Sequence, residues 1–143
     1  MTFGYDDVIV GLRSSYDARV DEREGVAVEP WKDAERARFL GLLRAEGRRT
    51  LVDVGAATGL HAEFFAAAGI DVTCVDLSPA MVDRCRAKGF EAYAQDVLHL
   101  ELPRRFPAAF AMNSLLHVPP ADLGCALEQV RGVLEAGALC YLG

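Results

Sequence analysis

Acidic and amide side chains close four apolar runs of this 143-residue chain. Asp53, Asp76 and Asp96 stand at or beside the ends of three runs, and Asn113 ends the fourth. Near-continuous apolar runs separated by helical segments are typical of buried parallel strands. The carboxyl ends of such strands meet at one edge of the sheet, where ligands of open α/β sheets bind. The four residues therefore predict a single binding site.

A loop of small residues follows Asp53 and leads into a helix-like segment, 60–68; its members are Gly55, Ala56, Ala57 and Gly59. The backbone amides of such a loop and the helix N-terminus can face a ligand. Asp76 follows Gly55 by 21 positions, close to the interval of about twenty residues expected for an acid that binds a ribose diol. Each hydrogen bond to such a carboxylate contributes about 1.5–3 kcal/mol. Loop and acid together favour a ligand that contains a ribose.

The elements that position these residues alternate between strands and helices, which predicts a doubly wound α/β fold with a mainly parallel sheet and helices on both faces. Two helices carry apolar stripes that we expect in the core: Met81, Val82 and Cys85 in one, and Leu123, Leu127, Val130 and Leu134 in the other. The expected strands are 50–54, 70–75, 91–95, 108–112 and 138–142, and the expected helices are 33–46, 60–68, 80–88 and 121–135.

The order and spacing of these segments resemble the class I S-adenosylmethionine-dependent methyltransferases over residues 51–142. Asp53 and the loop Gly55–Gly59 are similar to the family's acid and G-x-G-x-G motif, with Ala57 in place of the middle glycine. Asp96-Val97 resembles the third-strand position, and residues 110–118 resemble the segment after strand four, which often carries a leucine-histidine pair. A dinucleotide loop would instead need a glycine at Leu60.

The resemblance implies a strand order of 3-2-1-4-5 and S-adenosylmethionine as the cofactor. It implies that the cofactor lies across Gly55–Gly59, with its ribose on Asp76 beside Leu77 and its adenine facing Asp96 and packed on Val97. Asn113 would line the methyl-transfer cavity. Asp53 would either contact the ligand or order the loop from beneath.

His117 is the weak candidate for a catalytic base, because an imidazole titrates close to neutral pH. The alternative is that His117 only packs against the segment 118–120. The implied reaction transfers a methyl group to an unidentified, small-molecule acceptor. Two other functions stay open: a non-catalytic cofactor- or partner-binding domain, and an NAD-dependent oxidoreductase, which the glycine spacing and the lack of a Tyr-x-x-x-Lys pair disfavour.

The two ends of the chain raise separate questions. Residues 1–32 form a leader that carries Tyr5, Tyr16 and Trp31. Either this leader closes as a lid over the cofactor, or its aromatic residues only anchor it to a cofactor-binding domain, residues 33–143. The family has seven strands, and the resemblance here stops after five. A truncated form, a split form, a natural short variant and a chain that pairs with itself at strand five are all compatible with this, so a homodimer through the strand-five edge is one expectation.

Composition limits the partners. The formal net charge is −6 and no basic run exceeds two residues, which argues against nucleic acid. No apolar run reaches eighteen residues and no secretory leader appears, so we expect no membrane partner. The three histidines lack metal-ligand spacing, so we expect no metal. The four cysteines form no C-x-x-C pair and fit buried free thiols in the cytoplasm; they are Cys74, Cys85, Cys125 and Cys140.

Overall fold

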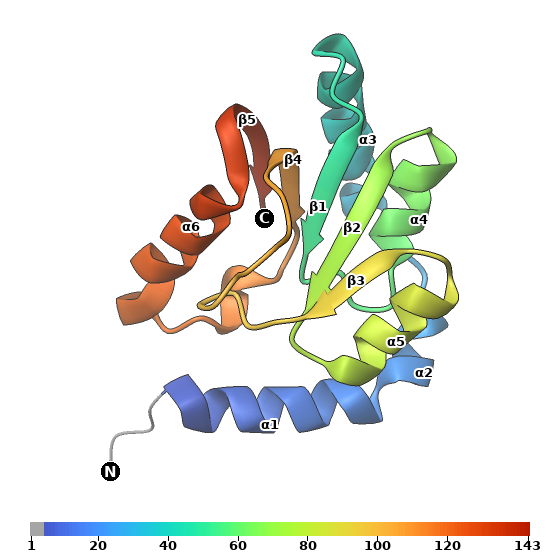
Figure 1. Ribbon diagram of the computed structural model, residues 1–143. Helices are drawn as coiled ribbons and strands as arrows, with labels where there is room; N and C mark the ends of the chain where they lie inside the picture. The colour runs from blue at the N-terminus through green and yellow to red at the C-terminus, as the bar shows by residue number, and fades with distance from the viewer. Residues whose placement is uncertain (1–4) are drawn as a thin grey trace.

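A computed structural model describes residues 5–143. Its centre is one five-stranded sheet in which every neighbouring pair is parallel, in the order β3-β2-β1-β4-β5 (Figure 1). The α/β fold and the strand order implied by the resemblance are therefore confirmed. The strands are β1 Thr50–Val54, β2 Asp71–Asp76, β3 Glu91–Ala94, β4 Phe106–Ala111 and β5 Leu134–Leu142.

Helices cover both faces of this sheet. α3, α4 and α5 cover one face, where Leu43, Phe65 and Cys85 pack against strand residues such as Phe110. α6 covers β4 on the other face through Val130. The helices are α1 Tyr5–Ala18, α2 Val20–Glu24, α3 Pro30–Ala45, α4 Leu60–Ala67, α5 Pro79–Ala87 and α6 Leu123–Gly132, with 3₁₀ turns η1 Leu115–His117 and η2 Pro120–Asp122.

The connection from β3 to β4 contains no helix. On the second face of the sheet, the side chain of Arg104 therefore covers part of β2 and β3. The Arg104 guanidinium donates to the buried hydroxyl of Thr73 at 3.1 Å and pairs with Glu91 at 3.1 Å. It also lies 4.9 Å from the ring centroid of Phe106. A long cationic side chain thus replaces helical cover at this edge of the sheet.

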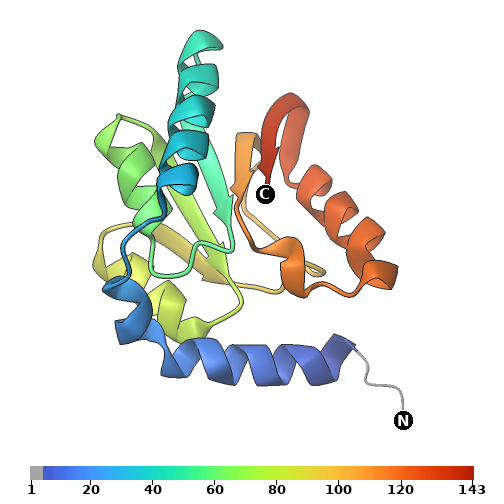
Figure 2. The same cartoon turned by 180° about the vertical axis from the view of Figure 1, so that it is seen from behind.

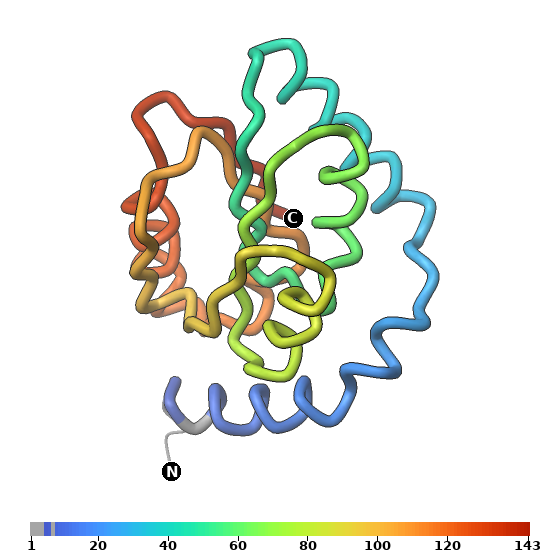
Figure 3. The backbone as a smooth tube through the Cα atoms, turned by 45° about the vertical axis from the view of Figure 1, so that its right-hand side comes forward, coloured from blue at the N-terminus to red at the C-terminus, as the bar shows by residue number. Residues whose placement is uncertain are grey.

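The N-terminal segment is more regular than the sequence analysis expected. α1 runs beneath the carboxyl ends of the strands in Figures 1 and 2, and the chain then passes through α2 and wraps one side of the domain up to α3 (Figure 3). α3 begins at Pro30, so this helix extends across the expected boundary at residue 32.

The last helix and strand differ from the expectation. The predicted helix 121–135 is divided, because η2 precedes α6 and β5 already begins at Leu134. β5 pairs with β4 at Leu134 and again from Leu139, and the residues between include Gly137 with a left-handed φ of +74°.

The predicted apolar stripe of this helix was also partly wrong. Leu123 and Leu127 are 38% and 39% exposed, whereas the buried residues are Ala126, Val130 and Val133. The face set by 126, 130 and 133 has the same helical spacing, and the small Ala126 lets the helix approach its neighbours closely. The other stripe, Met81, Val82 and Cys85, is buried as predicted.

The prediction for the cysteines was also correct only in part. Cys74 and Cys85 are buried free thiols, as expected. Cys125 and Cys140 are exposed, which corrects the expectation that all four are buried. Cys125 lies on α6 and Cys140 on the outermost strand β5, so both belong to the less covered side of the domain.

Candidate functional site

A cavity of about 390 Å³ lies where the loop after β1 meets the carboxyl ends of β2 and β4 and the residues just after β3. α1 forms one wall of it, through Tyr5, Ile9, Leu12 and Tyr16. Of the site residues predicted from the sequence, all but Asp53 and Gly59 line this cavity; they are Gly55, Ala56, Ala57, Asp76, Leu77, Asp96, Val97, Asn113 and His117. The fold therefore brings the predicted residues to one place.

The loop after β1 is held by the neighbouring strand. The amides of Gly55 and Ala56 both donate to the carbonyl of Val75, at 2.7 and 3.0 Å. Gly55 has a φ of +80°, and a Cβ atom there would lie 2.2 Å from the Cβ of Ser114. Glycine is thus required at position 55 both by the backbone conformation and by the chain that follows β4.

Ala57, in the place of the family's middle glycine, has a left-handed φ of +49°. This conformation costs an L-residue roughly 1–2 kcal/mol. Two contacts hold it there: the Ala57 amide donates to Asp76 Oδ2 at 2.8 Å, and the Ala57 carbonyl accepts from the Cys85 thiol at 3.2 Å. The loop therefore keeps the shape that a glycine would allow, at the cost of some strain.

Asp76 joins the loop to the end of β2. Its Oδ2 accepts from Ala57 and its Oδ1 accepts from the amide of Ser78 at 3.0 Å. Burial raises the pKa of this carboxyl above its ordinary value, although the amides of Ser78 and Ala57 act in the opposite direction. The two oxygens of a carboxylate have about four acceptor sites in total, so Asp76 keeps acceptor capacity for a ligand hydroxyl.

Asp53 lies beneath the loop rather than in the cavity wall. Its side chain is buried, and its Oδ2 has no hydrogen-bond partner among the described residues. Burial and then the nearby Asp76 raise the pKa of Asp53 to about 8, so this carboxyl is mostly protonated at neutral pH. Gly59 is also outside the wall, because it packs towards α5, where a Cβ would lie 3.3 Å from the Cys85 sulfur.

The residues after β3 and β4 form the opposite side. Asp96 Oδ1 accepts from the Tyr5 hydroxyl at 2.5 Å and from the Leu98 amide at 3.0 Å. Asn113 has a φ of +57°, a conformation that asparagine adopts more readily than most residues. The hydroxyl of Ser114 is buried against Gly55 without a hydrogen-bond partner among the described residues.

His117 lies in η1 and lines the cavity. Its ring meets the edge of the Tyr16 ring of α1, with 5.8 Å between the ring centroids and an angle of 68° between the planes. This aromatic contact joins the segment after β4 to α1 over the cavity. His117 is therefore placed both to pack and to face a ligand.

Three groups of cavity residues were missed by sequence reasoning. The first is the apolar part of the inner face of α1, Ile9 and Leu12. With Tyr5 and Tyr16, which the sequence analysis named as lid residues, they recur three or four positions apart, and this helical period was present in the sequence. The second is the connection 26–29. Its apolar residues carry no periodic signal, and only the docking of α2 brings them to the cavity.

His61 is the third. It lies two residues after the glycine loop, in the first turn of α4, and that position was a usable signal. Burial, followed by the cations Arg36 and Lys32, lowers the pKa of His61 to about 4. The imidazole is therefore neutral near pH 7, with Arg36 3.5 Å from its Nδ1. Such a ring can offer a hydrogen bond, but it is a poor carrier of positive charge.

Two further features bear on partners. None of the helices within residues 5–143 combines the length and apolar character that crossing a bilayer requires. In the part of the chain that the structure describes, no three His, Cys, Asp or Glu side chains gather closely enough to bind a metal ion.

Known proteins share both the sequence pattern and the fold. Over 104 residues the chain is 37% identical to a ubiquinone biosynthesis O-methyltransferase of Xanthomonas campestris pv. campestris (strain B100), covering 67% of this chain and 42% of that protein. The chain thus spans less than half the length of the curated relatives it matches.

Two solved structures superpose on most of the chain. One is a DhpI–SAM–HEP complex, with a TM-score of 0.73 and 25% identity, covering 96% of this chain and 66% of that one. The other is a magnesium protoporphyrin IX methyltransferase from Synechocystis PCC 6803 with bound SAM, with a TM-score of 0.74 and 16% identity, covering 94% and 75%. The second likeness concerns the fold alone.

The profile of the family described as "Methyltransferase domain" matches residues 51–137, which run from β1 into β5 and include the glycine loop, Asp76 and Asp96. Since that match covers more than half of the chain, and the relative of 37% identity covers two thirds of it, this chain belongs to the methyltransferase-domain family.

Proposed function

We propose that this domain binds S-adenosylmethionine and transfers its methyl group to a small-molecule acceptor. The observation that carries the proposal is the cavity wall in which Asp76 holds the loop Gly55–Gly59 and keeps acceptor sites for a ribose. The relatives named as methyltransferases and the neighbours solved with SAM support it.

The residues present fit this cofactor. The cavity volume falls in the range of roughly 300–1,000 Å³ that small-molecule sites occupy. Asp76 and Asp96 line it close to the loop, which suits a ligand whose sulfonium carries positive charge. When bound, the cofactor would supply an electrophilic methyl group; the chain's part is to orient the acceptor and to exclude water.

In this proposal Asp76 and Leu77 hold the ribose, Asp96 and Val97 the adenine, and the loop amides the amino-acid end. Asn113 and His117 face the acceptor. His117 serves as a base where the acceptor arrives protonated. Activity of a His117→Ala variant that stays unchanged across pH 6–9 would show that this residue only packs against Tyr16.

Calorimetric titration tests the cofactor assignment. We expect S-adenosylhomocysteine to bind and NAD not to bind; the reverse would indicate an oxidoreductase, and binding of neither would indicate an interaction domain. Asp76→Ala should weaken S-adenosylhomocysteine at least tenfold, because the hydroxyl bonds and the anchor of Ala57 are lost together. Asp71→Ala, an exposed acid at the opposite end of β2, is the matched control and should bind like the parent.

We further propose that α1 and α2 form a lid over the bound cofactor. α1 places Tyr5, Ile9, Leu12 and Tyr16 over the cavity, and all four side chains are only half-buried. An apolar helix face above an open cavity gains further burial when a ligand fills that cavity. This supports a lid more strongly than a simple anchor.

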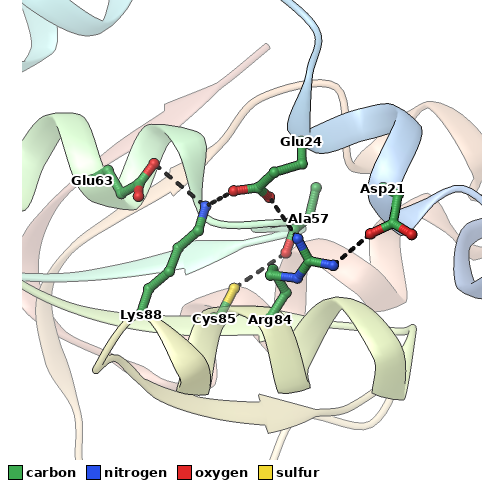
Figure 4. A network of polar contacts seen from close by, with 7 residues as sticks. All are labelled: Asp21, Glu24, Ala57, Glu63, Arg84, Cys85 and Lys88. Atoms are coloured by element: carbon green, nitrogen blue, oxygen red, sulfur yellow. Dashed lines mark hydrogen bonds and ion pairs between the residues drawn. The ribbon is translucent and has the colours of Figure 1, made fainter.

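Polar contacts hold α1 and α2 against α5, as the closed position of a lid requires. Asp17 accepts from the Ser78 hydroxyl and, at 3.2 Å, from the Ala80 amide at the start of α5. Figure 4 shows the ion pairs of α2 with α5 and with the residue that follows it: Asp21 with Arg84 at 2.6 Å and Glu24 with Lys88 at 2.6 Å. We call this set of three acids and their partners the latch.

The latch also reaches the cofactor loop. Lys88, directly after α5, contacts Glu63 of α4 at 3.4 Å as well as Glu24, and the Cys85 thiol of α5 donates to the Ala57 carbonyl (Figure 4). Burial raises the pKa of Glu24, but its contacts with Lys88 and Thr58 outweigh this and lower it overall. Glu24 is therefore ionised at neutral pH, as the ion pair requires.

Self-association through β5 is a separate proposal. β5 is the outermost strand, and a groove beside it is lined by Leu127, Leu134 and Leu142, of which Leu142 is 47% exposed. Apolar edges of this kind tend to pair. Light scattering tests it: a dimer is expected, and a stable monomer that transfers methyl groups would refute it.

The buried free thiols Cys74 and Cys85 support a reducing, cytoplasmic location.

A further inference from the structure

The cavity has an apolar side that is separate from the residues proposed to bind the ribose, the adenine and the amino-acid end of the cofactor. Its side chains come from three segments far apart in the sequence: α1, the connection from α2 to α3, and the residues around η1. Figure 2 shows these segments around the carboxyl ends of β1 and β4. Their apolar members are Ile9, Leu12, Val26, Val28, Leu116 and Val118.

Two of these residues are exposed at the rim. Val26 is 57% exposed and Leu116 is 71% exposed, although both also line the cavity. Neither contributes to the buried core clusters, so the fold gains little from an apolar side chain at either position. Both side chains are therefore available to the apolar part of a ligand in the cavity.

The charges on this side are mostly compensated. The Glu29 carboxylate pairs with Lys32 at 3.2 Å and accepts from the Trp31 indole at 2.5 Å. Arg23 is exposed, with its guanidinium 5.6 Å from the Tyr16 ring centroid. Arg23 is thus the cation that an anionic acceptor would contact.

We infer that the methyl acceptor is an uncharged, amphipathic molecule whose apolar body leaves the cavity between Val26 and Leu116. This inference rests on the proposed function. The polar end of the acceptor lies deeper, towards Asn113 and His117, and the apolar body gains its affinity from the rim. A strongly hydrated acceptor such as a free sugar, or a polyanion, finds few partners in this wall.

A homologous series of 4-alkylphenols, from phenol to 4-heptylphenol, measures the contact directly. The protein is first titrated with S-adenosylhomocysteine, which tests the cofactor site alone, and the series is then titrated by calorimetry into the saturated protein. Partial to full burial of each methylene should raise affinity roughly twofold to fourfold per added carbon. The double variant Val26→Ser, Leu116→Ser should lower this increment to less than about 1.5-fold.

Val10→Ser is the matched control. Val10 lies on α1 and is 65% exposed, but it does not line the cavity. Substitutions at exposed positions rarely change stability by more than about 0.5 kcal/mol, so all of these variants should fold. The control should keep the increment of the parent.

Three results would overturn the inference: no binding of any phenol, an increment that is the same in the double variant and the parent, or 4-pentylbenzoate binding tenfold tighter than 4-pentylphenol. The last would assign an anionic acceptor to Arg23. Failure of S-adenosylhomocysteine to bind would count against the proposed function instead. The phenol series on the unliganded protein would then still test the apolar rim.

Discussion

Two regions around the carboxyl ends of the strands differ in the kind of contact that their residues make. On the side of β1, β2 and α5, the strand ends and the loop are tied together by the bonds of Asp76 to Ala57 and Ser78 and by the thiol of Cys85. In the wall formed by α1, the connection 26–29 and η1, apolar side chains face solvent instead, among them Val26 and Leu116.

This difference separates two tasks. The β1–β2 side holds one backbone shape rigidly, as a site for a constant ligand requires. The wall next to η1 is assembled from distant segments, and its exposed residues can vary without disturbing the core. In our proposals the cofactor site therefore depends on a few atoms in fixed positions, whereas the acceptor wall depends on apolar area.

The largest effect should come from Gly55→Ala, which places a methyl group in the loop after β1, on the rigid side. The left-handed φ costs about 1–2 kcal/mol, and overpacking against Ser114 costs about 1–3 kcal/mol more, because the new Cβ would meet the Ser114 Cβ at 2.2 Å. Urea unfolding should show a loss of about 2–5 kcal/mol, and calorimetry should show a large loss of S-adenosylhomocysteine affinity.

Gly69→Ala separates the cost of the left-handed backbone from the cost of the contact with Ser114. Gly69 has a φ of +86°, but a Cβ added there would meet nothing within 4 Å, so only the conformational cost of about 1–2 kcal/mol should appear. Adding Ser114→Gly to Gly55→Ala should restore part of the loss. Equal losses at the two glycines would mean that the contact with Ser114 has no role.

The rigid side was also the more predictable one. Its strands are near-continuous apolar runs, and Asp76 and the glycine loop lie close together in the sequence, so spacing alone placed them at one edge. The stripe of α6 was misplaced because its leucines and the face of Ala126 and Val130 share the same helical period, and only packing selects between them. The left-handed Ala57 and the contact of Tyr5 with Asp96 depend on tertiary structure.

Asp53→Asn tests the buried carboxyl beneath the loop. The folded chain holds a proton on Asp53 up to about pH 8, whereas the unfolded chain releases it near pH 4. Stability should therefore fall as pH rises from about 4 to 8 and level off above that. Because an amide does not ionise, the stability of the Asp53→Asn variant should depend less on pH in this window.

Urea unfolding at intervals of one pH unit measures this slope. A residual slope is expected, because burial raises the pKa of Asp76 as well. Asp71→Asn, at an exposed position, should leave the profile of the parent unchanged. A parent whose stability rises between pH 5 and 8 would contradict the assignment of a protonated Asp53.

A smaller effect is expected at the latch. Lys88→Gln breaks the contacts with Glu24 and Glu63, and partly exposed ion pairs contribute about 0.2–1 kcal/mol each. Stopped-flow measurement should show S-adenosylhomocysteine leaving two- to fivefold faster, because the lid opens more often. Raising the salt concentration should speed release from the parent and have less effect on the variant.

Arg131→Gln is the control for the latch. Its ion pair with Glu128 lies on α6, with both side chains largely exposed, and it has no contact with α2. The release rate should match the parent at every salt concentration. A parent whose release rate ignores salt would show that α1 and α2 do not open by breaking these ion pairs.

The smallest effect should come from Ala57→Gly, where the loop combines rigidity with strain. Relief of the left-handed conformation gains about 1–2 kcal/mol, but glycine loses about 0.5–1 kcal/mol through its freedom in the unfolded chain. Urea unfolding should thus show a net gain of up to about 1.5 kcal/mol, with little change in S-adenosylhomocysteine affinity, because Asp76 and Cys85 already hold the loop in shape. Ala56→Gly, at a buried neighbour outside the left-handed region, should instead destabilise the chain. A large gain in affinity at position 57 would mean that strain weakens the cofactor site, and it would favour the non-catalytic alternative.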